Sequence, residues 1–246
     1  MNFIRIRGIE LVVGLAMALL LPPQRAAQGP LEAHLKVSKT EWVLGTPVEL
    51  TVSVSNVSQT PVQTSLFVSP KSGELSLMIS SDGSTFRRYL GPDWGTIEMG
   101  PRTFTFAPGS KQEASFSVLL NNDIDHGPTE PAWDFAFPHP GTYFIKANVL
   151  SGLGTLTSNV IQVVIQQPKG DDVPVWEAIR TDKRLARFLQ DPRPGQATSG
   201  EPEKLQQLLN DHPQSSHALY MKRALDRHSR LTAKIQEMKK TRNSPQ

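Results

Sequence analysis

The chain has 246 residues, 38% of them hydrophobic and 20% charged, as is typical of a soluble globular protein with one or two domains. It contains no cysteine, which excludes disulfides, thiolate-ligated zinc, a cysteine nucleophile and a lipid anchor on cysteine. The formal net charge is +3, but residues 28–172 hold 9 basic and 14 acidic side chains, whereas residues 173–246 hold 14 and 8. An acidic body with a basic tail does not indicate general nucleic-acid binding.

The first 27 residues have the pattern of a signal peptide. Arginines at positions 5 and 7 precede an apolar run over residues 11–21, which ends at Pro22-Pro23 before the small residues Ala26 and Ala27. This run is well short of the roughly 20 residues that a membrane-spanning helix needs. We therefore expect an exported protein, periplasmic or extracellular. Because the residues before Ala26 make a poor cleavage site, an uncleaved N-terminal anchor is the alternative.

From residue 31 to residue 167, short runs of alternating apolar and polar residues are separated by glycine, proline, asparagine and aspartate. The clearest is VELTVSVSN, residues 48–56, with valine or leucine at every second position. A period of two is typical of strands that bury one face. Similar runs predict strands at 31–38, 111–120 and 159–166, and the segment 74–90 predicts two strands joined by a tight hairpin at Asp82-Gly83.

A further strand is predicted in FAFPHPGTYFIKANV, residues 135–149. Pro140 and Gly141 form a turn, after which Tyr143 and every second residue face inward. In immunoglobulin-like sandwiches, a tyrosine at this place forms a corner in which its hydroxyl bonds nearby backbone. The alternative is that Tyr143 is an ordinary aromatic residue of its strand. About seven short antiparallel strands predict a two-sheet sandwich, and hence a mainly β protein.

Several of these segments resemble the immunoglobulin-like modules of exported bacterial proteins, including cell-adhesion-related modules and macroglobulin-type domains. The resemblance lies in WVLGTPVELTVSVSNVSQTPV (42–62), LSLMISSDGSTFRRYLGPDWG (75–95), and the 135–149 segment together with SNVIQVVI (158–165). It implies an immunoglobulin-like antiparallel β-sandwich over residues 28–170. It implies no chemistry, because the chain has no cysteine pair, thioester motif or catalytic signature.

After residue 171 the spacing becomes helical. Asp172 and Pro174 fit the start of a helix over 173–190, which we expect to end at Asp191-Pro192. A helical hairpin is predicted over 202–240, and its sequence LQQLLNDHPQSSHALYMKRAL resembles one unit of a tetratricopeptide repeat. The sequence thus predicts a signal peptide (1–27), a β-sandwich (28–170) and a small α-helical C-terminal region (171–246).

Three aromatic residues in or beside predicted turns are candidates for contact with a partner: Tyr89, Trp94 and Trp133. Aromatic side chains at the rim of a sandwich can stack on sugars or anchor a protein. The alternative is that they close the ends of the core. Gly141 and Tyr143 are assigned structural roles.

The loop before the Tyr143 strand contains Asp123, Asp125 and His126, which are weak candidates for a calcium site. Their spacing matches no defined metal-binding motif, and we predict no metal and no cofactor. No nucleophile elbow or glycine-rich phosphate loop occurs, so we predict no catalytic residues and no enzymatic activity.

The last predicted helix combines apolar residues at a spacing of about 3.5 with many lysines and arginines. Such a helix suits peripheral contact with an anionic membrane, docking on the acidic part of the same chain, or full solvation. Together these features predict an exported, non-enzymatic binding protein of the bacterial envelope, whose partner is an envelope protein or polysaccharide. The alternatives are an inhibitor or accessory subunit of an envelope enzyme, or a polysaccharide-binding module.

Overall fold

The computed structural model describes residues 29–70, 73–91, 103–123, 132–193 and 200–242. The described chain is 30% helical and 37% strand, with antiparallel sheets and four helices. The fold class is therefore mixed, in place of the mainly β class that the sequence predicts, because the C-terminal helices make up nearly as much of the described chain as the strands.

The smaller main sheet has three antiparallel strands in the order β1 (Leu31–Val37), β3 (Val48–Asn56) and β8 (Lys111–Val118). The predicted alternation of β3 is present: its valines and leucine at even positions from 48 to 54 are buried. The opposite face of the sheet carries polar side chains such as Lys36, Glu49 and Thr51.

The larger sheet has the order β2 (Glu41–Val43), β13 (Ile161–Gln166), β11 (Gly141–Ser151), β5 (Leu75–Ser80) and β6 (Arg87–Tyr89), with β12 (Gly154–Thr157) also paired to β11. Its pairs are antiparallel except for β2 and β13, which run parallel. Two short pairs complete the strands: β4 (Val62–Thr64) with β7 (Phe104–Phe106), and β9 (Leu120–Asp123) with β10 (Ala132–Phe135).

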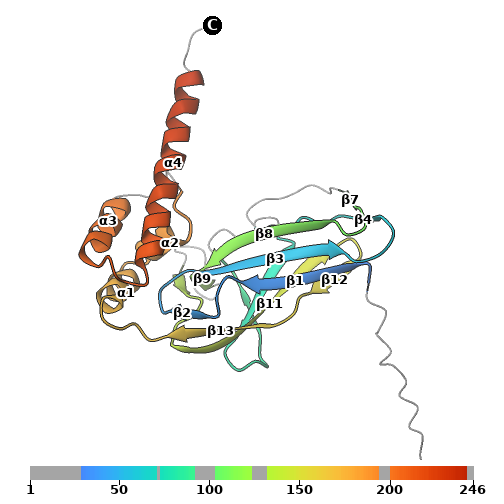
Figure 1. Cartoon of the computed structure of the whole chain (residues 1–246), viewed down its shortest axis with the longest axis horizontal. Helices are drawn as coiled ribbons and strands as arrows, with labels where there is room; N and C mark the ends of the chain where they lie inside the picture. Colours follow the sequence, from blue (N-terminus) through green and yellow to red (C-terminus); the bar gives the residue numbers. More distant parts are fainter. Residues whose placement is uncertain (1–28, 71–72, 92–102, 124–131, 194–199, 243–246) are drawn as a thin grey trace, which may run out of the picture.

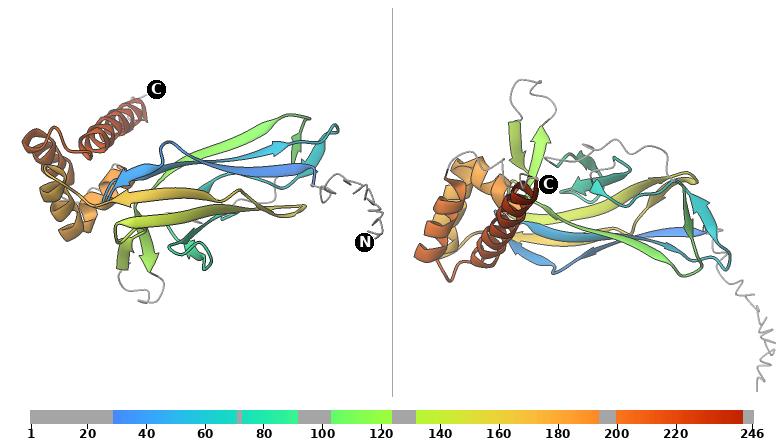
Figure 2. Two further views of the ribbon diagram at one scale, coloured as in Figure 1. Left: turned by 60° about the horizontal axis from the view of Figure 1, so that its bottom comes forward. Right: turned by 90° about the horizontal axis from the view of Figure 1, so that it is seen from above.

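The two main sheets form two layers, with β1 lying over β11 and β12 (Figures 1 and 2). Side chains from both layers meet in one apolar core, among them Leu35, Val52, Ile145 and Val163, all of which are almost completely buried. Burial of each such side chain stabilises the fold by about 1.5–3 kcal/mol.

The connection between β5 and β6 differs from the predicted tight hairpin, since it is a loop of residues 81–86. Asp82 organises this loop by accepting hydrogen bonds from the backbone N–H of Thr85 (2.7 Å) and of Ser84 (2.8 Å). These bonds hold the pKa of the Asp82 carboxyl well below its usual value. Gly83 has a φ of +76°, which suits glycine.

The helices are α1 (Asp172–Thr181), α2 (Lys183–Gln190), α3 (Glu201–Asp211) and α4 (Ala218–Arg242). The single helix predicted over 173–190 is therefore two. It is interrupted at Asp182, which leaves helical geometry and accepts a hydrogen bond from the N–H of Arg184. No helix in the described ranges is long and apolar enough to cross a membrane.

Candidate functional site

The turn between β2 and β3 is where the helical region contacts the sheets. Gly45 in this turn has a φ of +86°, and a Cβ placed on it would lie 2.4 Å from Cε3 of Trp176 in α1. Trp176 also packs edge-on against Phe135 of β10, with ring centroids 4.8 Å apart. The turn backbone thus directly contacts the indole ring, and a side chain at position 45 would push the helices away.

A second contact at this turn joins β2 to the start of α4. The rings of Trp42 and Tyr220 have centroids 6.1 Å apart, and Nζ of Lys39 lies 4.4 Å from the Trp42 ring centroid. Burial and the nearby Glu49 charge raise the pKa of Tyr220 to about 12, whereas the Arg223 charge acts in the opposite direction. Nη1 of Arg223 donates to Oε1 of Glu49 at 2.6 Å, so the basic C-terminal region is ion-paired to the acidic sheets.

Gln190, the last residue of α2, joins the helical region to both layers through its side-chain amide. Its Oε1 accepts from the N–H of Leu120 (2.8 Å), and its Nε2 donates to the carbonyl of Ser117 (3.1 Å) and to the hydroxyl of Tyr89 (2.9 Å). The Tyr89 hydroxyl in turn donates to the Leu120 carbonyl (2.9 Å). One amide therefore satisfies backbone groups in the way that a neighbouring strand would.

Asp172, Ser215 and His217 lie together at the junction of α1 and α4. Oδ1 of Asp172 accepts from the Ser215 hydroxyl (2.8 Å) and from the N–H of Ser216 (2.6 Å). His217 is fully buried, with Nδ1 3.2 Å from the Ser215 hydroxyl and Nε2 3.1 Å from the carbonyl of Leu44. Because a carbonyl only accepts, Nε2 carries the proton.

These three residue types also form hydrolase triads, but their geometry here is different. In a triad the histidine lies between the serine and the carboxylate, with one ring nitrogen facing each. Here both groups are on the Nδ1 side, since Nδ1 is 3.6 Å from Oδ1 of Asp172, and Nε2 is held by backbone. This cluster ties α1 and α4 to the β2–β3 turn and is structural.

Burial lowers the pKa of His217, although the Asp172 charge and the Leu44 hydrogen bond act in the opposite direction. For Asp172, burial alone would raise the pKa. Hydrogen bonds from Ser215 and Ser216, together with the His217 charge, bring the pKa of this carboxyl below its ordinary value.

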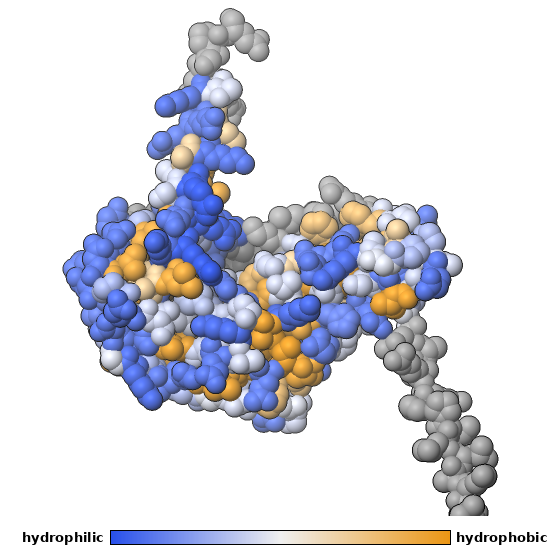
Figure 3. All heavy atoms as spheres, in the orientation of Figure 1, coloured by the Kyte–Doolittle hydropathy of each residue, from blue (hydrophilic) through white to orange (hydrophobic). Residues whose placement is uncertain are grey.

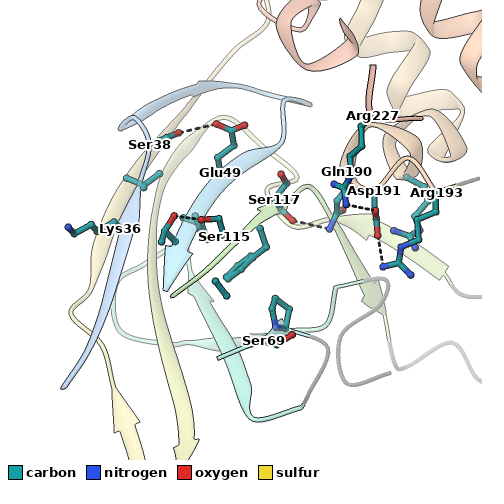
Figure 4. Close-up of a pocket in the computed structure, with 17 residues that line it drawn as sticks. Lys36, Ser38, Glu49, Ser69, Ser115, Ser117, Gln190, Asp191, Arg193 and Arg227 are labelled. Carbon is teal, nitrogen blue, oxygen red and sulfur yellow. Dashed lines mark hydrogen bonds and ion pairs between the residues drawn. The ribbon is translucent and has the colours of Figure 1, made fainter. Parts of the chain in front are cut away.

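An open hollow of about 800 Å³ lies between the polar face of the smaller sheet and the helices (Figure 4). The hydroxyls of Thr51 and Ser115, 2.8 Å apart, form part of its floor. Its helical wall contains Asp191, which pairs with Arg193 (2.5 Å) and Arg227 (3.5 Å).

The lining of this hollow includes four consecutive residues of β8, from Ala114 to Ser117. Neighbouring residues of a strand point to opposite faces. Gln190, which also lines the hollow, bonds the Ser117 carbonyl on the side of β8 that faces away from β3, which we call the outer edge of β8. The hollow therefore extends to this edge. This hollow is the candidate binding site.

The structure corrects the role assigned to Tyr89. Its side chain is only 1% exposed and its hydroxyl is bonded to Leu120 and Gln190, so Tyr89 is part of the structure and does not reach a partner. Trp94 lies outside the described residues. Trp133 belongs to β10 by its backbone, but its side chain is not among those described.

Of the three metal candidates, only Asp123 lies within the described residues. Asp125 and His126 lie outside it, and Asp123 is described only by its backbone, at the end of β9. Elsewhere in the described ranges, no three histidine or carboxylate side chains come together as a metal site would require.

The structural residues Gly141 and Tyr143 lie at the start of β11. Tyr143 is 7% exposed, and its hydroxyl donates to the carbonyl of His139 at 2.9 Å, which is the bond to nearby backbone that the sequence predicts. Burial raises the pKa of this hydroxyl. Gly141 has a φ of +152°, within the range that favours glycine.

No family model and no curated protein matches the chain. Among solved structures, a β-glucosidase from Listeria innocua in complex with glucose has 13% identity and a TM-score of 0.28, covering 55% of this chain and 16% of its own. An alkylpurine DNA glycosylase from Pseudomonas fluorescens bound to DNA has 12% identity and a TM-score of 0.28, with coverages of 56% and 30%. A sporulation control protein from Bacillus subtilis has 15% identity and a TM-score of 0.29, with coverages of 63% and 56%. The chain thus spans less than two thirds of each, and similarities this low carry no functional conclusion.

Proposed function

We propose that this chain is an exported, non-enzymatic interaction protein of the bacterial envelope, which binds an extended segment of a partner protein along the outer edge of β8. The observation that carries this proposal is the hollow of about 800 Å³ that extends to that edge, where Gln190 bonds the Ser117 carbonyl. Export rests on the signal-peptide pattern of residues 1–27.

For the sheets we propose an immunoglobulin-like sandwich. Three observations support it: the two-layer arrangement, the bond from Tyr143 to the His139 carbonyl, and the resemblance of residues 42–62 to such modules. This architecture leaves the outermost strand of a layer open on one side unless something covers it.

The outer edge of β8 has backbone groups available for a further strand. Within the described residues, β8 is hydrogen-bonded to a strand on one side only, by β3. The Ser110 carbonyl, just before β8, accepts from Asn56 of β3, whereas the Ser117 carbonyl accepts from the Gln190 side chain. Because backbone direction alternates along an antiparallel strand, the odd-numbered residues direct their N–H and C=O away from β3.

Gln190 occupies one end of this edge and shows how it can be used. Its amide bonds the Ser117 carbonyl from outside the sheet, as the peptide group of an added strand would. Ser115 and Glu113, farther along the same edge, present the next outward backbone groups, and Ser115 also lines the hollow. An extended peptide laid there would gain main-chain hydrogen bonds, and the polar side chains of the floor would select its sequence.

The polysaccharide alternative depends on exposed aromatic rings. Tyr89 is buried, and the side chains of Trp94 and Trp133 are not among those described. Tyr89 therefore presents no ring on which a sugar could stack.

The test compares two substitutions at one position of the edge. Short peptides selected from a phage-displayed library against the full chain are measured by fluorescence anisotropy with each variant. Ser115→Pro removes the outward N–H but no backbone bond to β3, and both variants lose the hydroxyl contact with Thr51. Proline is tolerated at strand edges, so we expect folding with loss of binding. Ser115→Ala keeps the N–H and is expected to bind like the unmodified chain.

Circular dichroism checks whether Ser115→Pro is folded. If it is not, Glu113→Pro replaces it, because it also removes an outward N–H from the same edge. If the selected peptides bind the proline and alanine variants equally well, the partner does not add a strand to β8 and the proposal fails.

A further inference from the structure

The second half of α4 extends away from the rest of the molecule (Figures 1 and 2). In the first half, Met221 and Ala224 are buried in the core, and the His228 ring lies 5.1 Å from that of Phe188 in α2. Beyond this contact the helix continues from residue 229 to residue 242, a length of about 21 Å.

This extended half carries apolar side chains that do not contact the core. Leu231 and Ile235 are only partly buried, and Met238 is 55% exposed. None of the three belongs to the apolar side chains that form the core or pack against it.

Five apolar residues of α4, together with His228, follow a heptad pattern. Positions 221, 224, 228, 231, 235 and 238 are separated alternately by three and four residues, which is the spacing of the seam in a coiled coil. The part of this pattern over residues 231–238, which we call the α4 seam, is narrow, and Figure 3 shows mainly hydrophilic side chains on the visible face of the extended half of α4. A helix that lies on a membrane has a wider apolar face with bulky Trp, Phe and Leu side chains. The seam therefore favours another helix as the occupant.

The charges around the α4 seam indicate which kind of helix. Residues 229–242 contain five basic side chains and one acidic, a net charge of +4. Lys234 and Lys239 occupy the positions on either side of the seam, where a coiled coil places the side chains that face its partner. In a parallel pair of two copies these lysines would face each other, and in an antiparallel pair each would face its own counterpart. Like charges at these positions disfavour a second copy of this chain.

We propose that the α4 seam docks an acidic amphipathic helix of another protein. The apolar side chains of that helix cover Leu231, Ile235 and Met238, and its Asp or Glu residues pair with Lys234 and Lys239. This surface is separate from the outer edge of β8, so the chain can connect an extended segment of one partner to a helix of another.

Two synthetic peptides of three heptads test the proposal against the full chain. Both carry the same Ile and Leu seam, but one has Glu and the other Lys at the flanking positions. By isothermal titration calorimetry we expect the Glu peptide to bind at least about tenfold more tightly than the Lys peptide, because like charges across an interface reject a partner. Added salt is expected to reduce this preference.

Variants of the full chain then separate the seam from its charges. Ile235→Ser is expected to remove binding of the Glu peptide, and Lys234→Glu combined with Lys239→Glu is expected to transfer the preference to the Lys peptide. Lys240→Glu reverses one lysine charge on the opposite side of the helix and is expected to keep the original preference.

Equal affinity for both peptides, or unchanged binding by Ile235→Ser, would overturn the proposal. So would cosedimentation with phosphatidylserine vesicles in the absence of peptide binding, which would assign the surface to a membrane. Dimerisation in analytical ultracentrifugation that Ile235→Ser abolishes would assign it to a second copy.

Discussion

Replacement of Gly45 by alanine tests the contact between the helical region and the sheets. The added Cβ would lie 2.4 Å from the Trp176 ring, whereas ordinary contacts begin at 3.4 Å, so the ring or the turn has to move by about 1.0 Å. Overpacking of this kind costs roughly 1–3 kcal/mol, and a φ of +86° costs an alanine roughly 1–2 kcal/mol more. The sum is about 3 kcal/mol, which for a chain of this size lowers the melting temperature by roughly 6–12 °C.

Gly109→Ala is the matched control, because Gly109 has a φ of +73° but no atom within 4 Å of an added Cβ. This variant loses stability only through its backbone conformation, by roughly 1–2 kcal/mol. Both variants are melted under the same conditions and followed by circular dichroism and tryptophan fluorescence. If Gly45→Ala melts no lower than Gly109→Ala, the turn backbone does not pack on Trp176 and the described junction is wrong.

Three further predictions concern the bonds within and between the layers. Gln190→Ala removes the hydrogen bonds to the Leu120 N–H, the Ser117 carbonyl and the Tyr89 hydroxyl. It is expected to lower the free energy of unfolding by about 2 kcal/mol, and a denaturation midpoint like that of the unmodified chain would show that the amide is dispensable. Tyr143→Phe keeps the buried ring but loses the hydroxyl bond, so a loss of about 1 kcal/mol is expected in urea denaturation, and an unchanged midpoint would exclude the corner role. Burial lowers the pKa of His217 below 6.5, so the unfolded chain takes up this proton first and stability falls as the pH drops below about 6.5, by up to about 1.4 kcal/mol per pH unit. Below pH 3.8 stability falls further, because the pKa of Asp172 is lower in the folded chain and the unfolded chain takes up this proton first. His217→Gln is expected to reduce the loss of stability between about pH 6.5 and pH 3.8. If the stability of the variant falls with pH in parallel with that of the unmodified chain, His217 is not the group responsible.

Local periodicity predicts the strands well, because burial of one face requires alternation along the chain itself. Residues 48–56 alternate in sequence, and the same residues form β3 with its apolar side chains in the core. The end of the helical segment at Gln190 is also predicted from the local sequence. Pro192 follows Asp191, and the residue before a proline is biased away from helical geometry. The interruption at Asp182 is not, because it depends on one side chain capping α2.

Contacts between distant segments leave little local signal, and the candidate binding site is built from them. Gln190 bonds groups 70, 73 and 101 residues away, and nothing in its neighbourhood marks it. Tyr89 was expected at the surface because a turn follows it, yet it pairs with Leu77 on the buried side of the larger sheet. Gly45 is a further example, because the sequence does not show that Trp176 packs on it.

The most direct test of the proposed binding edge is amide hydrogen exchange of the full chain, resolved by residue with NMR. Because backbone direction alternates along β8, the amides of Ala114 and Phe116 are expected to be protected by β3, whereas those of Glu113 and Ser115 exchange rapidly. Protection of Ser115 equal to that of Ala114 in the chain alone would mean that the outer edge of β8 is already paired, and the account of its function would be wrong.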